Sequence, residues 1–232
     1  MNLSRALAAG AAGLLLCALP ARGAVVAGRV VLTDKGRAST DPTVDPRRAV
    51  VWFEPDPRPL AANEPRPEPL QPVVAEMTTV RKQFLPQVLV VPVGSTVRFT
   101  NQDAILHNAF SVSGRNAFDS GLVGAGKVKE ATFREAGVVR VFCNVHHAMF
   151  SHVVVVPTPY YVQPGADGAF RLERLPAGRG TLRVWHERGE LQARALTLPS
   201  TAPVELSIEI TQPRVPPHKN KFGKSYTGGG YG

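Results

Sequence analysis

The apolar residues of this chain fall in short β-branched runs that Gly, Pro, Asn and Asp interrupt, and this pattern restricts the fold more than any other. Runs such as 87–93, 137–142 and 152–156 have the length of strands, and no window repeats with the period of an amphipathic helix. The length of 232 residues suits one large or two small domains. We therefore expect an all-β protein built from sandwiched sheets.

Strand density and proline content divide the chain into segments. Candidate strands at 25–32 and 49–53 precede a Pro-rich stretch, a denser series begins at Val74, and a third group lies between Tyr160 and Thr211. The last residues combine Pro, Lys, Gly and Tyr without periodicity, which favours disorder. The predicted segments are a signal peptide at 1–23, a first sandwich portion with its linker at 24–72, a central domain at 73–157, a second sandwich portion at 158–212 and a disordered basic tail at 213–232.

The first residues have the features of a secretory signal. Arg5 precedes an apolar run from Ala6 to Leu19, and small residues follow near Gly23. This run is too short for a membrane-spanning helix. We predict cleavage near Gly23, a periplasmic or secreted protein, and no firm association with a membrane.

Cysteine use is unusual for an exported chain. Cys17 leaves with the predicted signal peptide, so Cys143 has no partner for an internal disulfide. A metal bond would occupy the thiolate and protect it from oxidation. The alternative is a buried cysteine that packs as a small apolar residue, but its neighbours in the sequence favour the metal.

The residues around Cys143 in the sequence are also of types that bind metal ions. His146 and Met149 follow Cys143 within six residues, and His107 lies 36 residues before it. Two histidines and one cysteine with a weak axial methionine are the ligands of a blue-copper site. Zinc binds the same nitrogen and sulfur atoms, but Met149 would be a poor fourth ligand for it.

Residues 73–156 resemble the cupredoxins of the plastocyanin, pseudoazurin and amicyanin kind. The resemblance is carried by the sequence VLVVPVGSTVRFTN at 88–101, by LHN at 106–108 and by FCNVHHAM at 142–149. It implies a Greek-key β-sandwich with one type 1 copper site that cycles between Cu(I) and Cu(II). The implied equatorial ligands are His107, Cys143 and His146, and the implied axial ligand is Met149.

The resemblance also implies a role for Asn108, whose backbone N–H would face the cysteine sulfur while its side chain ties the two ligand loops together. Phe150 departs from the family, where a small residue often follows the methionine. We interpret His147 as a residue that faces a partner and His152 as structural. His186 and His218 have no cluster of ligands around them in the sequence and are also interpreted as structural.

The flanking segments resemble a second family, the carboxypeptidase regulatory-like (transthyretin-type) sandwich. The residues that carry this resemblance are 27–30, 167–170, 175–178 and 182–186. Neither flank has enough strands for a stable sheet, so we expect one smaller sandwich split by insertion of the cupredoxin. The layout is similar to bacterial exported proteins labelled as methylamine-utilization or plastocyanin-like proteins.

We predict a one-electron carrier and not an enzyme, because the chain has no His-x-His clusters for further copper ions and no motif for nucleophilic or phosphoryl chemistry. Its net charge of +9 favours an acidic redox partner, although solubility alone would also explain it. The basic residues are scattered and the chain is predicted to be exported, so we expect no nucleic acid. Two alternatives stay open: copper storage or delivery without redox cycling, and a secreted binding module with a structural metal.

Overall fold

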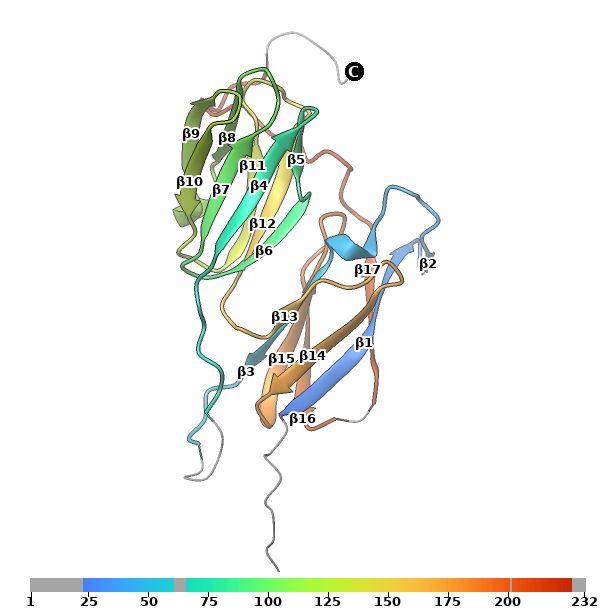
Figure 1. Cartoon of the computed structure of the whole chain (residues 1–232). Coiled ribbons are helices and arrows are strands. Elements are labelled where there is room, and N and C mark those ends of the chain that lie inside the picture. The colour runs from blue at the N-terminus through green and yellow to red at the C-terminus, as the bar shows by residue number, and fades with distance from the viewer. Residues whose placement is uncertain (1–22, 61–65, 201, 227–232) are drawn as a thin grey trace, which may run out of the picture.

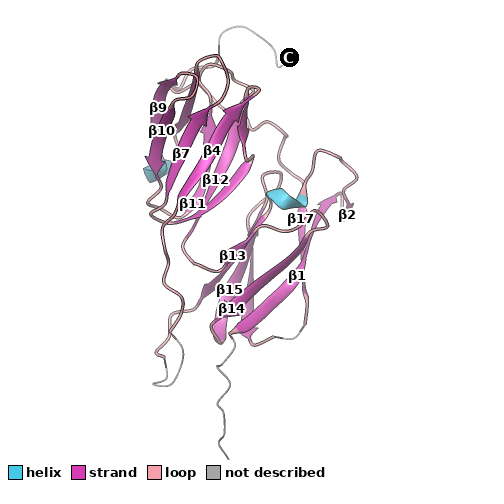
Figure 2. Ribbon diagram, in the orientation of Figure 1, coloured by secondary structure: helices cyan, strands magenta, loops and turns pink. Residues whose placement is uncertain are grey.

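The computed structural model describes residues 23–60, 66–200 and 202–226, and within them the chain is all-β, as predicted. Its strands form four sheets, arranged as two sandwiches that lie one above the other in Figure 1. Strands make up nearly all of the regular secondary structure in Figure 2, and the helices among the described residues are single 3-10 turns. No helix among the described residues is long and apolar enough to cross a membrane. The predicted signal peptide lies almost wholly outside these residues.

The middle of the chain forms the upper sandwich. One sheet has the order β10-β7-β4-β5, with strands β4 (Val74–Val80), β5 (Gln83–Leu85), β7 (Thr96–Asn101) and β10 (Val128–Thr132). The other has the order β6-β12-β11-β8-β9, with strands β6 (Val88–Pro92), β8 (His107–Ser111), β9 (Phe118–Val123), β11 (Gly137–Phe142) and β12 (Phe150–Val156). A 3-10 turn, η2 (Gly114–Asn116), precedes β9.

Alternating side chains fill the space between these two sheets. In β7, for example, Val97 and Phe99 point inward while Arg98 is exposed, which is the period of a half-buried strand. The same core holds Cys143 and Met149 at the end of the sandwich. The sandwich therefore buries the thiol beneath the loops that join its strands.

The flanks of the chain form the lower sandwich together. One sheet contains β1 (Ala24–Asp34), β2 (Arg37–Ala38), β14 (Ala169–Leu175) and β17 (Val204–Glu209). The other contains β3 (Val50–Pro55), β13 (Tyr161–Val162), β15 (Gly178–Trp185) and β16 (Gln192–Leu198). The 3-10 turn η1 (Pro46–Arg48) leads into β3. Each sheet thus pairs strands from before the central segment with strands from after it, and a separate apolar core lies between them.

A third apolar cluster joins the two sandwiches. It contains Trp52 and Trp185 from the lower sandwich and Val88, Val154 and Val156 from the upper one, all of them buried. Burying two tryptophans removes a large apolar area from water. The two sandwiches therefore pack against each other through β3 and β15 on one side and β6 and β12 on the other.

The structure adds strands that the sequence pattern did not predict, chiefly β9 and β16, which are rich in polar and exposed residues. His107, the first of the implied copper ligands, is the first residue of β8. The structure of the C-terminal tail also differs from the prediction of disorder. Residues 213–226 contain no helix or strand, but Lys221 and Tyr226 hydrogen-bond to the upper sandwich. These contacts are between distant segments, which a local sequence pattern does not register.

Candidate metal centre

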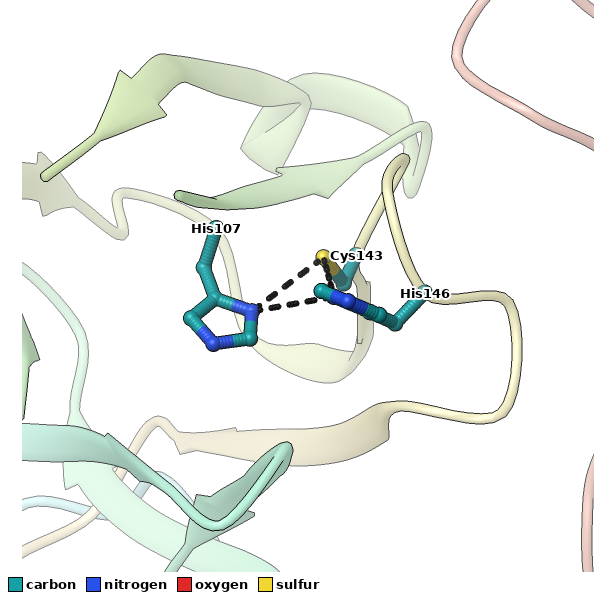
Figure 3. A group of neighbouring side chains, drawn as sticks. All are labelled: His107, Cys143 and His146. Carbon is teal, nitrogen blue, oxygen red and sulfur yellow. Dashed lines mark hydrogen bonds between the residues drawn. The ribbon is translucent and has the colours of Figure 1, made fainter. Parts of the chain in front are cut away.

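Two loops of the upper sandwich bring one thiol and two imidazoles together. His107 begins β8, Cys143 follows the last residue of β11, and His146 lies in the connection to β12. Sγ of Cys143 is 3.9 Å from Nδ1 of His107 and 3.9 Å from Nδ1 of His146. The two Nδ1 atoms are 3.2 Å apart. Figure 3 shows both rings and the sulfur turned toward one another.

This triangle fits a single metal ion. Bonds of about 2.0 Å to nitrogen and about 2.3 Å to sulfur are ordinary in protein metal centres, and three atoms spaced in this way could all bind one ion at such lengths. His107 and Cys143 are buried, and His146 is half-buried. One soft thiolate with two imidazoles in a trigonal arrangement suits copper. Within the described residues, no other group of three such side chains converges in this way.

Met149 closes the loop that carries the ligands. Its backbone N–H donates to the carbonyl of His146 at 3.0 Å, and its carbonyl accepts from the N–H of Cys143 at 3.2 Å. Its side chain is buried in the same core as Cys143. These contacts hold the thioether residue beside the thiol, and its role as the axial ligand stays a prediction.

Asn108 connects the two ligand loops, as the resemblance implied for its side chain. Its Oδ1 accepts from the backbone N–H of Asn144, the residue after the cysteine, at 3.3 Å. Its Nδ2 donates to Oδ1 of Asp119 at 2.7 Å and to the carbonyl of Gly121 at 2.9 Å. Asn108 is buried, so these bonds fix the start of β8 against both β9 and the cysteine loop.

Asp103 is a functional residue that sequence reasoning missed. Its Oδ2 lies 2.8 Å from Nε2 of His107, on the side of the ring away from Cys143. Its two carboxylate oxygens also accept from the backbone N–H groups of Arg81 at 2.6 Å and Lys82 at 2.9 Å. Both of these residues have positive φ and form the tight turn between β4 and β5. The β4–β5 turn therefore positions the Asp103 carboxylate, and this carboxylate in turn positions the His107 ring.

The charge state of Asp103 follows from these contacts. Burial raises the pKa of this carboxyl. The hydrogen bonds from the N–H groups of Lys82 and Arg81 and from the His107 ring together lower it by more, so the net pKa lies below its ordinary value. An ionised carboxylate only accepts hydrogen bonds. Nε2 of His107 must then be the donor, which leaves the lone pair on Nδ1 directed at the thiol and at His146.

Asn101 shapes the loop between Asp103 and His107. Its Nδ2 donates to the carbonyls of Ile105 and Val123, each at 2.8 Å, and its Oδ1 accepts from the N–H of Asp103 at 2.9 Å. A short Asx side chain that bonds nearby backbone is a common way to build such a loop. The sequence pattern alone does not single out the polar run from Asn101 to Asp103 as part of the site. The signal available in the sequence is that this run lies four to six residues before His107.

The protonation of His146 also suits metal binding. Burial and the neighbouring charges of His107 and Lys82 lower its pKa, against a smaller opposing effect of Asp103. The ring therefore stays neutral at physiological pH. A neutral imidazole is the form that binds a metal.

The remaining histidines divide into two groups. His152 and His186 are buried, as expected for structural residues, and burial lowers their pKa values to about 3 and about 4. His147 lies beside the ring of Tyr226, with the ring centroids 5.6 Å apart. His218 belongs to no group of converging metal ligands within the described residues, as expected for a structural residue, and its ring stacks on Phe142, next to the cysteine, with the centroids 4.0 Å apart and an interplanar angle of 8°. Residues 213–226 run back along the upper sandwich and bring the His218 ring to this position.

No protein-family model and no curated protein matches the chain. Among solved structures, a purple cupredoxin from Nitrosopumilus maritimus is 28% identical over 35% of this chain and 99% of its own, with a TM-score of 0.32. A reduced amicyanin variant is 28% identical over 35% of this chain and 80% of its own, with a TM-score of 0.33. The likeness covers about a third of this chain and the TM-scores are low, so the description of the centre depends on the residues themselves. On those residues, the upper sandwich is cupredoxin-like in its strands and its ligands, and the lower sandwich has no assigned family.

Proposed function

We propose that this protein is a one-electron carrier with a single type 1 copper ion held by His107, Cys143, His146 and Met149. The observation that carries the proposal is the triangle of Sγ and two Nδ1 atoms, in which Cys143 and His107 are buried and His146 is half-buried. When bound, copper supplies the change between Cu(I) and Cu(II). The protein supplies the soft sulfur, the two imidazoles and the rigid frame around them.

That frame suits electron transfer because it resists rearrangement. The backbone N–H of Cys143 donates to the carbonyl of Met149, the N–H of Met149 donates to the carbonyl of His146, and His107 is fixed through Asp103. A site that keeps its geometry in both oxidation states has a low reorganisation energy for electron transfer. His146 is the half-buried ligand, so it is the one of the three that is least shielded from solvent.

Copper storage or delivery is the second candidate. A site for a copper chaperone must release its ion to an acceptor, and a half-buried His146 in a short loop offers one route for exchange. The buried positions of Cys143 and His107 favour retention instead. We therefore rank electron transfer first.

We further propose that the protein acts outside the cytoplasm, after loss of a signal peptide, and that it meets an acidic redox partner. The lone Cys143 supports export, because a metal-bound thiolate tolerates an oxidising compartment. The lower sandwich is proposed to be of the transthyretin type. Its assembly from both flanks of the chain supports an insertion.

The test is to add Cu(II) to the purified full chain. We expect an intense blue or purple band from thiolate-to-copper charge transfer and a reversible reduction. Cys143→Ser is expected to abolish the band, and His218→Gln, which changes a histidine outside the triangle, is the control expected to keep it. A colourless protein that retains Cu(I) without cycling would favour storage, and full colour in Cys143→Ser would refute the ligand assignment.

A further inference from the structure

The C-terminal segment, defined here as residues 213–226, lies on the upper sandwich beside the metal centre. The backbone N–H of Lys221 donates to Oδ1 of Asn144 at 3.1 Å, and Nζ of Lys221 pairs with Oδ2 of Asp119 at 2.7 Å. Asn144 follows the cysteine, and Asp119 is the carboxylate that holds Asn108. The segment is therefore attached to the cysteine loop and to β9, the strand whose Asp119 holds Asn108.

Aromatic rings connect this segment to the cysteine. The imidazole of His218 is almost parallel to the ring of Phe142, with the centroids 4.0 Å apart. Tyr226 lies 5.3 Å from His218 by ring centroids, and its hydroxyl donates to the carbonyl of Cys143 at 3.3 Å. An electron tunnels more readily through stacked rings and hydrogen bonds than across a gap through space. A contiguous path thus runs from the thiol residue to the segment.

The outer face of the segment is basic. The segment has no acidic residue and four cations, of which Lys221 is paired with Asp119 while Arg214, Lys219 and Lys224 are exposed. Lys219 and Lys224 are exposed, and Phe222 is 71% exposed beside them. An exposed aromatic ring among cations is suited to docking against an acidic protein surface, because the charges steer the encounter and the ring adds apolar contact.

We propose that the C-terminal segment is the docking surface for an acidic one-electron partner protein, and that the His218 ring carries the electron between this surface and the metal centre. The inference depends on the proposed electron-carrier function. When the partner is the donor, it loses one electron and the centre gains one, and no bond or proton is exchanged. Ile105 and Val145, the second of them next to His146 in the chain, are exposed apolar residues outside the segment, and electron exchange through His146 is the alternative that the experiment tests.

The experiment uses reduced, copper-loaded full chain mixed with hexacyanoferrate(III), an anionic oxidant that stands for the acidic partner. At an ionic strength of about 0.1 M, charges act over about 10 Å, so local charge decides the rate. Reversing two exposed cations, Lys219→Glu with Lys224→Glu, is expected to slow oxidation about tenfold. The cationic oxidant tris(phenanthroline)cobalt(III) is expected to react faster with this variant. The matched control, Lys127→Glu with Lys129→Glu, reverses two exposed charges on the strand β10 and its turn.

The ring path is tested separately. His218→Ala is expected to slow electron exchange with both oxidants while the reduction potential and the copper band stay unchanged. His218→Phe retains a flat ring and is expected to restore the rate, which separates conduction from loss of attachment of the segment. Equal rates for both charge-reversed variants, or an unchanged rate in His218→Ala, would overturn the proposal and assign exchange to the His146 face. A wild-type chain without a copper band would instead refute the proposed function itself.

Discussion

The carboxylate of Asp103 accepts a hydrogen bond from Nε2 of His107 at 2.8 Å, and the opposite nitrogen of the same ring faces Cys143. A carboxylate behind a ligating histidine fixes the ring and its tautomer and makes the ligand more basic. Two backbone N–H groups in the β4–β5 turn fix Asp103 in turn. The turn, the carboxylate and the histidine therefore act as one unit.

Asp103→Asn is predicted to weaken Cu(II) binding by about 10- to 100-fold. The neutral amide has the same shape but removes a negative charge that stabilises Cu(II) more than Cu(I). Each tenfold loss of Cu(II) affinity relative to Cu(I) raises the reduction potential by about 59 mV. Competition titration and a redox titration measure the two effects.

Glu76→Gln is the control for that variant, because it removes one exposed carboxylate from β4 of the same sandwich. It is expected to leave both the affinity and the potential close to wild type. An Asp103→Asn protein with a wild-type potential would mean that Asp103 only shapes the loop.

The sequence predicted the all-β class because alternating runs such as Thr96–Asn101 carry their own period. It predicted the ligand cluster because Cys143 and His146 are close in the chain and their chemistry is distinctive. Asp103 was missed because a carboxylate four residues before a histidine is an ordinary loop residue until the β4–β5 turn closes on it. Contacts that depend on two distant segments have no local signature.

The C-terminal segment illustrates the same limit. Its composition is that of a disordered chain, and composition reports only that a segment cannot build its own core. The segment needs no core of its own, because His218 packs on Phe142 and Lys221 pairs with Asp119. An existing domain supplies the surface that orders it.

Asn108→Ala is predicted to lower the free energy of unfolding by about 1–3 kcal/mol, since it leaves the half-buried carbonyl of Gly121 in β9 and the half-buried N–H of Asn144 in the cysteine loop without their partner. Urea denaturation of the metal-free protein measures the loss. Gln102→Ala removes an exposed amide from the neighbouring loop and serves as the control. Equal stability of the two variants would show that Asn108 does not brace the site.

Met149→Leu is predicted to raise the reduction potential while the thiolate-to-copper band remains. Leucine has a similar volume, so the buried core around Cys143 is kept at a cost below about 1.5 kcal/mol. It has no sulfur, and loss of a weak axial donor destabilises Cu(II) more than Cu(I). Redox titration followed at the copper band measures the shift, and an unchanged potential would exclude Met149 as a ligand.

His186 is predicted to make the protein sensitive to acid. Its ring is fully buried, with Nε2 3.1 Å from the carbonyl of Asp45 and Nδ1 accepting from the N–H of Arg188 at 3.1 Å. Burial is the main cause that lowers its pKa to about 4, with Arg48 and Arg188 adding to the effect and the contact with Asp45 opposing it. The neutral ring is therefore the form that the folded protein holds.

Because the folded pKa lies below the unfolded value of about 6.5, the unfolded chain takes up the proton first as the pH falls. Stability is complete above about pH 6.5 and is lost toward pH 4, by at most about 1.4 kcal/mol per pH unit for this one group. His186→Gln keeps a donor and an acceptor but does not titrate. Urea denaturation of metal-free protein between pH 7 and pH 5 is expected to give a shallower decline for the variant, and parallel declines would refute the assignment.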